Sequence, residues 1–442
     1  MAVMGGIVGS GIFINPYVVA SLVHTPALIL GSWVVGGAFA MLGACIYAEL
    51  AGRLPKVGGQ YAYLREALRP LLGFLFGWSY LLVIGAGGTA AVAVTCAKYI
   101  RQLGTVPIPE NLLAVIVVVA LVIVNCLGVR AGSGVQSALM LLRILAIVLI
   151  VAAGAWFVIH PSGTPSPGWR PLLGQPVSFG LLTTFGAALV PVLFAYGGWE
   201  SSNFIASEIR EPRKNLPRAL ILGVLGVLVL YLSVNFIYLL VLSPAGLAAT
   251  DTPASKVMSR IFGDAGARVI GLAIVISTLG FLSQAMLTYP RLYFAMAADA
   301  GLPSWFAQVA ERSRVPVAAI LLQGCVTSAV ILLGTYEQIL SYVVVLDWLF
   351  FGLTAACLFS LRRRDLRASD PNAQTAAGYR VPGHPWTTGL FVLVAGVMVF
   401  NTIYKYPRNA GIAVCILFAG IPFYFLTRRL ARPAAGTRLE LP

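Results

Sequence analysis

Two glycine-rich stretches decide the fold of this chain: Gly5-Gly-Ile-Val-Gly-Ser-Gly-Ile-Phe13 and Phe194-Ala-Tyr-Gly-Gly-Trp-Glu200. Each lies inside an apolar segment long enough to cross a bilayer, which takes about 20 residues of helix. Glycine in a helix interior costs about 1 kcal/mol relative to alanine, so clustered glycines favour a local break. The two stretches therefore predict two helices that unwind part-way through an apolar layer.

The composition around these stretches is that of an integral membrane protein. The 442 residues are 59% hydrophobic and only 10% charged, with a mean hydropathy of +0.89. Soluble domains are about 45–50% apolar and about 25% charged, so cytosolic enzymes and secreted scaffolds are excluded. The spacing of Ser, His and acidic residues supports no catalytic arrangement, and no cofactor is expected. The six cysteines lie inside apolar segments without the spacing of a metal site or a disulfide framework.

Apolar segments separated by short breaks predict an all-α polytopic membrane protein with twelve transmembrane helices. The segments lie near 1–24, 27–50, 71–99, 110–128, 136–159, 178–205, 217–243, 265–298, 315–334, 338–361, 386–404 and 410–427. Because the loops between them are short, the alternating strands of a β-barrel are not a competing interpretation.

The net charge of +15 indicates membrane orientation and not a nucleic-acid partner, because the basic residues stand in short loops between the apolar segments. Most of the 30 Lys and Arg residues fall on the side that carries both chain ends. This bias predicts a multi-pass protein of the cytoplasmic membrane with both termini inside. The stretch Arg362-Arg-Arg364 is explained by orientation, with contact to anionic lipid as the alternative. Apolar sequence begins at Met1 itself, which suggests that a cytoplasmic leader is missing.

The positions of the two broken helices predict an internal repeat. Residues 1–160 hold five spans and residues 178–361 hold five more, and each half opens with its interrupted helix. An odd number of spans per half inverts the second half relative to the first. Glycine-interrupted segments at corresponding positions point to the substrate site of a transporter. Two accessory spans, 386–427, and a cytoplasmic tail, 428–442, would complete the chain.

The breaks also predict what the site recognises. Where the first broken helix restarts, the N–H groups of Gly9, Ser10 and Gly11 would lie at a helix N-terminus, which suits a carboxylate. Where the sixth helix stops, unpaired carbonyls near Phe194 and Ala195 can accept from an ammonium group. The predicted amine-binding and gating segment is Phe194, Ala195, Tyr196, Gly197, Gly198 and Trp199. A carboxylate site beside an ammonium site predicts an α-amino acid as the small-molecule substrate.

The alternative is that these glycines only let helices pack closely. That interpretation is favoured for Gly85, Gly87 and Gly88 in the third span. For the two breaks the functional interpretation is preferred, because both carry clustered glycines at matching positions.

At these residues the chain resembles the amino acid–polyamine–organocation superfamily, through Gly9-Ser-Gly-Ile-Phe13 and Gly197-Gly-Trp-Glu200. The stretches Glu208-Ile-Arg-Glu-Pro-Arg-Lys-Asn-Leu-Pro217 and Tyr289-Pro-Arg-Leu-Tyr-Phe-Ala-Met-Ala297 are most similar to the L-type amino acid transporter branch. The resemblance covers essentially the whole chain. It implies a five-plus-five inverted repeat, alternating access, sodium-independent exchange of amino acids and an aromatic gate at Phe194. Members of this branch that pair with a glycoprotein use a cysteine in the outer loop between spans 3 and 4. Residues 100–110 contain none, so no disulfide-linked partner is expected.

Ionisable residues inside a membrane are costly and are functional candidates by default. The resemblance places Arg143 where that branch often has a lysine and sodium-coupled relatives hold a cation; snorkelling to the surface is the alternative. Glu200 follows the second break and is a candidate for gating, proton coupling or recognition of a cationic side chain. Asp347 is expected to pair internally with another buried group. Glu49, at the end of a span, is expected to be interfacial.

These residues, read with the resemblance, predict a carrier of neutral amino acids, and the resemblance implies that it works by sodium-independent exchange. One alternative is a proton-coupled or antiporting carrier of basic amino acids or polyamines, in which Glu200 recognises the positive charge. An alternative of another class is a nutrient sensor or receptor on a transporter fold. A channel is a further possibility.

Overall fold

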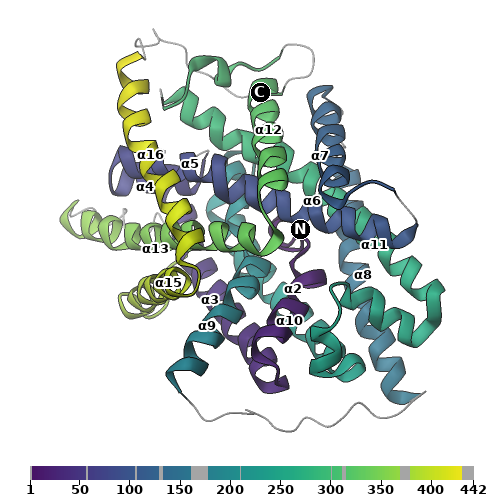
Figure 1. Cartoon of the computed structure of the whole chain (residues 1–442). Helices are drawn as coiled ribbons and strands as arrows, with labels where there is room; N and C mark the ends of the chain where they lie inside the picture. The colour runs from purple at the N-terminus through teal and green to yellow at the C-terminus, as the bar shows by residue number, and fades with distance from the viewer. Residues whose placement is uncertain are drawn as a thin grey trace.

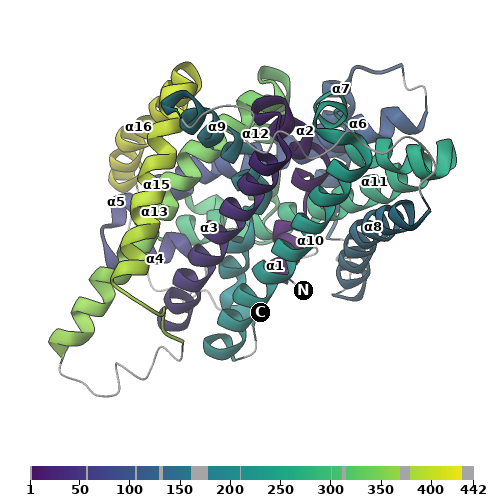
Figure 2. The same ribbon diagram turned by 90° about the horizontal axis from the view of Figure 1, so that it is seen from below.

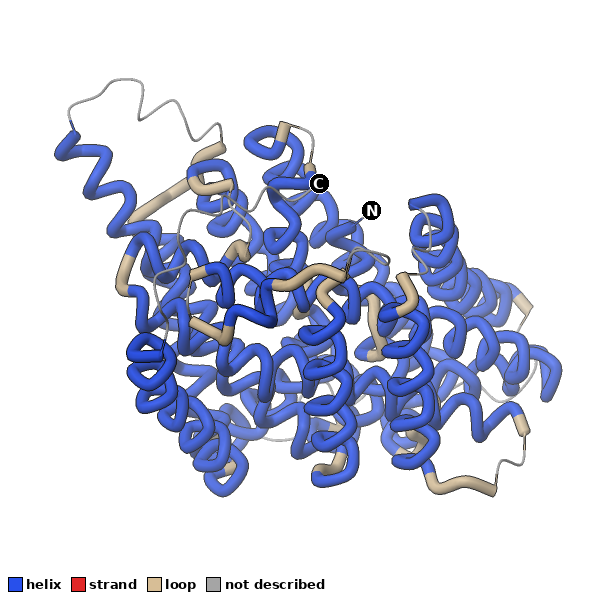
Figure 3. Tube along the Cα trace, turned by 90° about the horizontal axis from the view of Figure 1, so that it is seen from above, coloured by secondary structure: helices blue, strands red, loops and turns tan. Residues whose placement is uncertain are grey.

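The computed structural model describes residues 2–55, 58–104, 107–128, 133–160, 178–209, 211–299, 301–310, 315–368 and 379–430. Within these residues the chain is almost entirely helical and forms no strand (Figures 1 and 3). The predicted all-α fold class is confirmed. Of the predicted tail 428–442, residues 428–430 continue the last helix, and the rest lies outside the described residues.

The helices have the following bounds: α1 (Ala2–Ile7), α2 (Gly11–Val23), α3 (Pro26–Arg53), α4 (Gln60–Ala67), α5 (Pro70–Ser79), η1 (Tyr80–Ile84), α6 (Gly85–Leu103), α7 (Glu110–Cys126), α8 (Ser133–Ile159), α9 (Phe179–Tyr196), η2 (Trp199–Glu208), α10 (Pro212–Ala248), α11 (Pro253–Ala298), η3 (Ser304–Ala307), α12 (Val317–Leu333), α13 (Tyr336–Ala368), α15 (Trp386–Lys405) and α16 (Pro407–Leu430). A π-helical turn, η1, joins α5 to α6 in one continuous run.

Nine helical runs in the described part of the chain are long and apolar enough to cross a bilayer. Three shorter apolar helices, α2, α7 and α12, coincide with the first, fourth and ninth predicted spans. The helix α2 is short because it is only the second part of a broken helix. Length and composition therefore support a polytopic membrane protein with nine such crossings, and the total of twelve stays a prediction.

Two long helices contain bends that the apolar pattern already marked. In α10 the backbone of Ser243 has a φ of 64°, directly before Pro244, and in α11 Gly263 has a φ of 67°. A positive φ cannot be part of a regular right-handed helix. The predicted spans 217–243 and 265–298 end and begin at these two bends, so the sequence located the straight, apolar part of each helix.

The broken helix lies in the middle of the bundle. Figures 1 and 2 place α1 and α2 centrally, with α8 at one side and α15 and α16 at the other. Both α2 and α3 pack against α9, α3 lies beside α10, and α13 lies beside α15. The two interrupted segments are therefore enclosed by other helices, which is where unpaired backbone groups at membrane depth are tolerated.

Glu49 of α3 is buried within the protein, close to the end of its helix, and its interfacial depth in the membrane stays a prediction. Its carboxylate accepts hydrogen bonds from Arg53 at 2.9 Å, from Arg362 at 2.6 and 2.9 Å, and from the N–H of Val381 at 2.7 Å. Arg53 also pairs with Asp365. The apolar pattern could not show that the end of α13 returns to the end of α3. We call Glu49, Arg53, Arg362 and Asp365 the Glu49 cluster, and the end of the bundle where it lies the Glu49 face.

Candidate functional site

The first break separates α1 from α2. In a continuous helix Gly9 N–H would donate to the carbonyl of Gly5; here it donates to the carbonyl of Ile7 at 2.8 Å. Ser10 and Gly11 stand at the start of α2, where N–H groups have no acceptor within the helix. Ser10 Oγ is buried and has no hydrogen-bond partner among the described residues. The break thus presents main-chain donors and a free hydroxyl at the positive end of a helix, as predicted, but Gly9 N–H is already used.

The second break ends α9 at Tyr196. Gly198 has a φ of 99°, a conformation that glycine adopts at little cost. Gly197 N–H donates to the carbonyl of Phe194 at 3.2 Å, so that carbonyl is not unpaired, contrary to expectation. The later carbonyls of Ala195 and Tyr196 lie in the last turn, where no donor of the same helix can reach them. The C-terminal end of α9 therefore offers carbonyl acceptors, but they begin at Ala195, one residue later than the predicted Phe194.

The two breaks touch, backbone against backbone. A Cβ on Gly198 would lie 2.1 Å from the carbonyl oxygen of Gly6, and one on Gly11 would lie 2.6 Å from Cα of Ala195. Real Cβ atoms do not come this close to other atoms, so no larger residue fits at either contact without a shift. Asn15 adds a third link, donating from Nδ2 to the carbonyl of Pro191 at 2.6 Å. The breaks are held against each other at three points.

A cavity of about 60 Å³ lies between the breaks. At roughly 10–15 Å³ for each water, it holds a few solvent molecules. Its walls come from α1, α2, the α5–η1–α6 run, α9, η2, α11 and α13 and from the residues at the two breaks. Of the predicted residues, the following line it: Gly9, Ser10, Gly11, Phe194, Ala195, Gly197, Gly198, Glu200 and Asp347.

Two carboxyl groups face this cavity. Glu200 Oε2 accepts from the N–H of Gly198 at 2.9 Å, and Asp347 Oδ2 lies 3.9 Å from the position of a Cβ on Gly197. Asp347 Oδ1 is buried without a hydrogen-bond partner among the described residues, so the expected internal pairing of Asp347 is not found. Two acids at neighbouring glycines are a costly arrangement unless a proton or a cation accompanies them.

Arg143 of α8 lies outside the cavity but against the first break. Its side chain is buried, so snorkelling to the surface is excluded. Nη1 donates to the carbonyl of Gly5 at 3.0 Å, the same carbonyl that the break releases from Gly9. Nη2 lies 2.8 Å from the position that a Cβ on Gly280 of α11 would occupy. The guanidinium group therefore places a fixed positive charge between α1, α8 and α11.

Tyr196 and Trp199 do not reach the cavity. Tyr196 packs against Trp33 and Tyr231, with ring centroids 5.8 and 5.2 Å away. Trp199 stacks on Phe351 at 5.3 Å. A helix turns about 100° per residue, so neighbours of Phe194 point to other sides. The predicted role of these two residues in the amine-binding segment could involve only their main chain.

Sequence reasoning missed several wall residues. Tyr80, Phe281 and Tyr289 line the cavity from η1 and α11, and Gly6 contacts Gly198. Gly88 also lines it, and a Cβ there would meet nothing within 4 Å. The packing interpretation is therefore wrong for Gly88. The π-helical turn that carries Tyr80 is of a kind that often marks functional sites, but no sequence pattern signals it.

Residues 1–425 match the model of the family described as "Amino acid permease". The chain belongs to this family. It is 29% identical over 436 residues to the large neutral amino acids transporter small subunit 2 of Mus musculus, covering 96% of this chain and 78% of that protein. It is 29% identical over 440 residues to the human Asc-type amino acid transporter 1, with coverages of 96% and 80%. The serine/threonine exchanger SteT of Bacillus subtilis is 27% identical over 427 residues, with coverages of 96% and 94%.

Family membership makes this amino acid permease a membrane transporter of amino acids and not an enzyme. It confirms the resemblance on which the sequence interpretation relied. The permease brings together most of the predicted substrate-binding segment at the point where its two broken helices touch.

Proposed function

We propose that this permease exchanges neutral L-amino acids across the cytoplasmic membrane, without sodium, by alternating access. The printed names of two relatives, one a large neutral amino acids transporter and one a serine/threonine exchanger, support this cargo, and a third is an amino acid transporter by name. The contact between the two breaks is the observation that carries the proposal. It puts the donors of α2 and the acceptors of α9 around one cavity, which is the pairing that a free α-amino and α-carboxyl group need.

In this mechanism the substrate carboxylate takes the N–H groups of Ser10 and Gly11 and the free Ser10 hydroxyl. The ammonium group binds carbonyls at the end of α9, Ala195 foremost. Phe194 lines the cavity from one wall and would act as its gate. The halves 1–160 and 178–361 form the inverted repeats that rock about the site, followed by the accessory spans 386–427. The Glu49 face and both termini are cytoplasmic, and no disulfide-linked subunit is required.

Arg143 supports sodium independence. A cation bound between α1, α8 and α11 would have to share that space with a guanidinium group that already holds the Gly5 carbonyl. Two positive charges that share one small, poorly hydrated space inside a protein repel each other strongly. Arginine does not release its proton in proteins, so Arg143 also does not carry a coupling proton.

The exchange itself is tested in proteoliposomes loaded with unlabelled serine or left empty. Labelled serine, threonine or leucine is expected to enter the loaded vesicles much faster than the empty ones, at the same rate in sodium and potassium buffers. Uptake into empty vesicles that needs an inward sodium gradient would contradict the proposal. Uptake driven there by an inward proton gradient would assign coupling to a carboxyl group of the cavity.

A second function is favoured by one observation, the presence of Asp347 beside Glu200. In the alternative function, the cargo is a basic amino acid or a polyamine, and the sequence alone offers Glu200 to recognise its positive charge. A second carboxyl group in the same cavity strengthens that alternative, since a cationic side chain bound there would lie beside both acids. The two candidates differ in what the carboxyl groups do: bind cargo, or hold a proton while neutral cargo passes.

Glu200→Gln and Asp347→Asn distinguish the two. If cargo is neutral, each variant is expected to retain neutral amino acid exchange within about tenfold, since the amides keep the shape of the side chains. If cargo is cationic, each loses a charge-assisted contact in the cavity, worth about 1.5–3 kcal/mol or roughly 10–150-fold in lysine or putrescine uptake. The measurement is competition of labelled serine by both classes of ligand. Equal losses for both classes would contradict any role in side-chain selection.

A further inference from the structure

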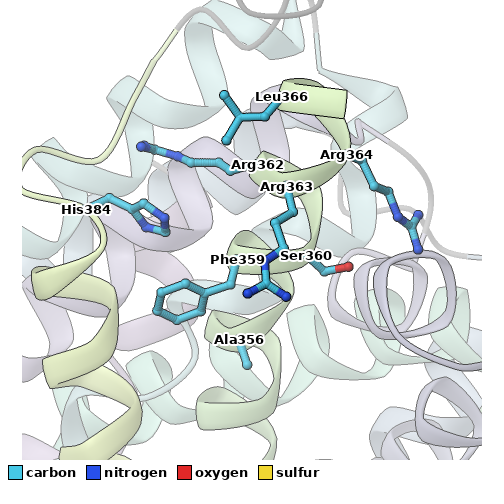
Figure 4. A pocket seen from close by; sticks show the side chains of 8 residues that line it. All are labelled: Ala356, Phe359, Ser360, Arg362, Arg363, Arg364, Leu366 and His384. Atoms are coloured by element: carbon cyan, nitrogen blue, oxygen red, sulfur yellow. The ribbon is translucent and has the colours of Figure 1, made fainter. Parts of the chain in front are cut away.

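A second cavity, much larger than the first, opens at the Glu49 face. It has a volume of about 610 Å³ and lies between the last turns of α13 and the segment that leads into α15. Among the residues that the structure describes, none in its wall is acidic; the wall residues are Ala356, Phe359, Ser360, Arg362, Arg363, Arg364, Leu366 and His384 (Figure 4). It shares no residue with the cavity between the breaks.

The positive charge of this cavity is only partly cancelled. Arg362 pairs with Glu49 at 2.6 Å, and Arg364 donates to the main-chain carbonyls of Glu66 and Ala67. Arg363 is exposed and has no hydrogen bond or ion pair within the described residues. Figure 4 shows its guanidinium group folded back along α13, beside Phe359 and Ser360. An arginine that points back along a transmembrane helix, without a counter-ion, can be matched by an anion from outside the protein.

His384 adds a hydrogen-bonding group but no charge. Its ring lies on Phe359, with centroids 5.0 Å apart, and Nδ1 is 2.9 Å from Thr388 Oγ1. Burial and the nearby Arg362 lower the pKa of His384 below its ordinary value, so the ring is neutral at pH 7. The uncancelled charge of the cavity therefore comes from Arg363 and Arg364.

The rest of the wall is apolar and continues into the surface of α15. Leu366 is 74% exposed, and Trp386, two residues after His384, is 84% exposed. The outward side of α15 beyond Trp386 is a further series of exposed apolar residues, namely Leu390, Leu393, Val397 and Phe400. In a membrane protein such a surface faces acyl chains, and a tryptophan at its end is typical of the headgroup level. The cavity lies where a helix surface in contact with lipid meets uncancelled arginines.

We propose that this cavity binds the phosphate of an anionic phospholipid from the adjoining leaflet. Arg363 and Arg364 hold the phosphate, His384 donates or accepts at the headgroup, and the acyl chains follow Leu366, Trp386 and α15. Basic pockets at the ends of transmembrane helices take anionic headgroups in this way. A soluble anion would use the arginines but not the apolar wall. The site is independent of the transported substrate; the proposed orientation only assigns it to the cytoplasmic leaflet.

The test is native mass spectrometry of the purified, full-length permease with phosphatidylglycerol, with phosphatidylcholine of the same chains, and with inorganic phosphate as a competitor. Phosphatidylglycerol is expected to bind several-fold more tightly than phosphatidylcholine. Arg363→Gln should lower its affinity about fivefold, since a basic residue near the membrane surface contributes about that factor. Arg363→Lys keeps the charge and should bind nearly as well.

Arg218→Gln is the matched control, since Arg218 is exposed at the start of α10 and has no contact with the cavity. It should bind phosphatidylglycerol like the unmodified protein. The proposal is overturned if both lipids bind equally, or if Arg363→Gln and Arg218→Gln behave alike. Displacement of the lipid by millimolar inorganic phosphate would instead identify a site for soluble anions. Amino acid exchange by each variant shows that the proteins compared are folded.

Discussion

Gly11→Ala is expected to lower amino acid exchange by about one to two orders of magnitude while leaving the protein in the membrane. The added methyl group would lie 2.6 Å from both Cα and Cβ of Ala195, so one broken helix must move away from the other. Overpacking of this kind costs about 1–3 kcal/mol, and here the cost falls on the geometry that pairs the donors of α2 with the acceptors of α9. The measurement is the initial rate of serine exchange per mole of reconstituted protein.

Gly31→Ala is the control for Gly11→Ala. Gly31 is a glycine of α3 whose added Cβ would meet only a ring carbon of Phe185 at 3.9 Å, an ordinary contact. Exchange by this variant should be unchanged. If Gly11→Ala exchanges serine at the normal rate, the contact of the two breaks is not the substrate site. If it is absent from the membrane, Ser10→Ala supplies the same test, since it removes only the free hydroxyl.

Glu49→Gln is expected to lower the free energy of unfolding by about 3–5 kcal/mol. The carboxylate of Glu49 is buried and holds two arginines and one main-chain N–H. Removal of one partner of a buried ion pair leaves the other charges uncompensated, which costs about that much. The glutamine keeps the shape of the side chain, so the loss reports on charge. Thermal unfolding in detergent, followed by the amount of permease that stays monodisperse, measures it.

Glu337→Gln serves as the matched control for Glu49→Gln. Glu337 is exposed, and within the described part of the chain its carboxylate accepts only a long hydrogen bond of 3.3 Å from Tyr17, so its neutralisation should change stability by less than about 1 kcal/mol. Arg362→Gln should destabilise about as much as Glu49→Gln, and the double variant should lose less than the sum of the two. Additive losses would mean that Glu49 and Arg362 do not act as a pair.

Much of the fold could be predicted because bilayer thickness and backbone hydrogen bonding leave few choices. The apolar runs located all of the long helices, and their ends marked the bends at Ser243 and Gly263. The helix α4 was not predicted, since its eight residues are amphipathic and lie between two spans. Spans are identified by long apolar runs, and α4, like a polar loop, contains no such run.

The parts of the candidate site that depend on local backbone preferences could be predicted from the sequence. The side chains that reach the cavity through the packing of distant helices could not. Clustered glycines located both breaks, because the preference of glycine is local. The direction of Asp347 towards the cavity depends on the rotation of α13, which no single-chain pattern reports. Tyr80 and Tyr289 likewise reach the site only through the packing of α11 against the α5–η1–α6 run.

The Glu49 cluster also has a consequence for how the chain is made. Glu49 and Arg362 are separated by 313 residues, so α3 is synthesised and inserted long before α13 exists. During that interval the only member of the cluster on the same helix is Arg53, four residues away. Glu49 therefore enters the membrane with Arg53 as its partner. Arg362 replaces part of the water around the Glu49 carboxylate only after α13 has been inserted. Nascent chains that stop before α13 carry an acid that lacks its bidentate partner.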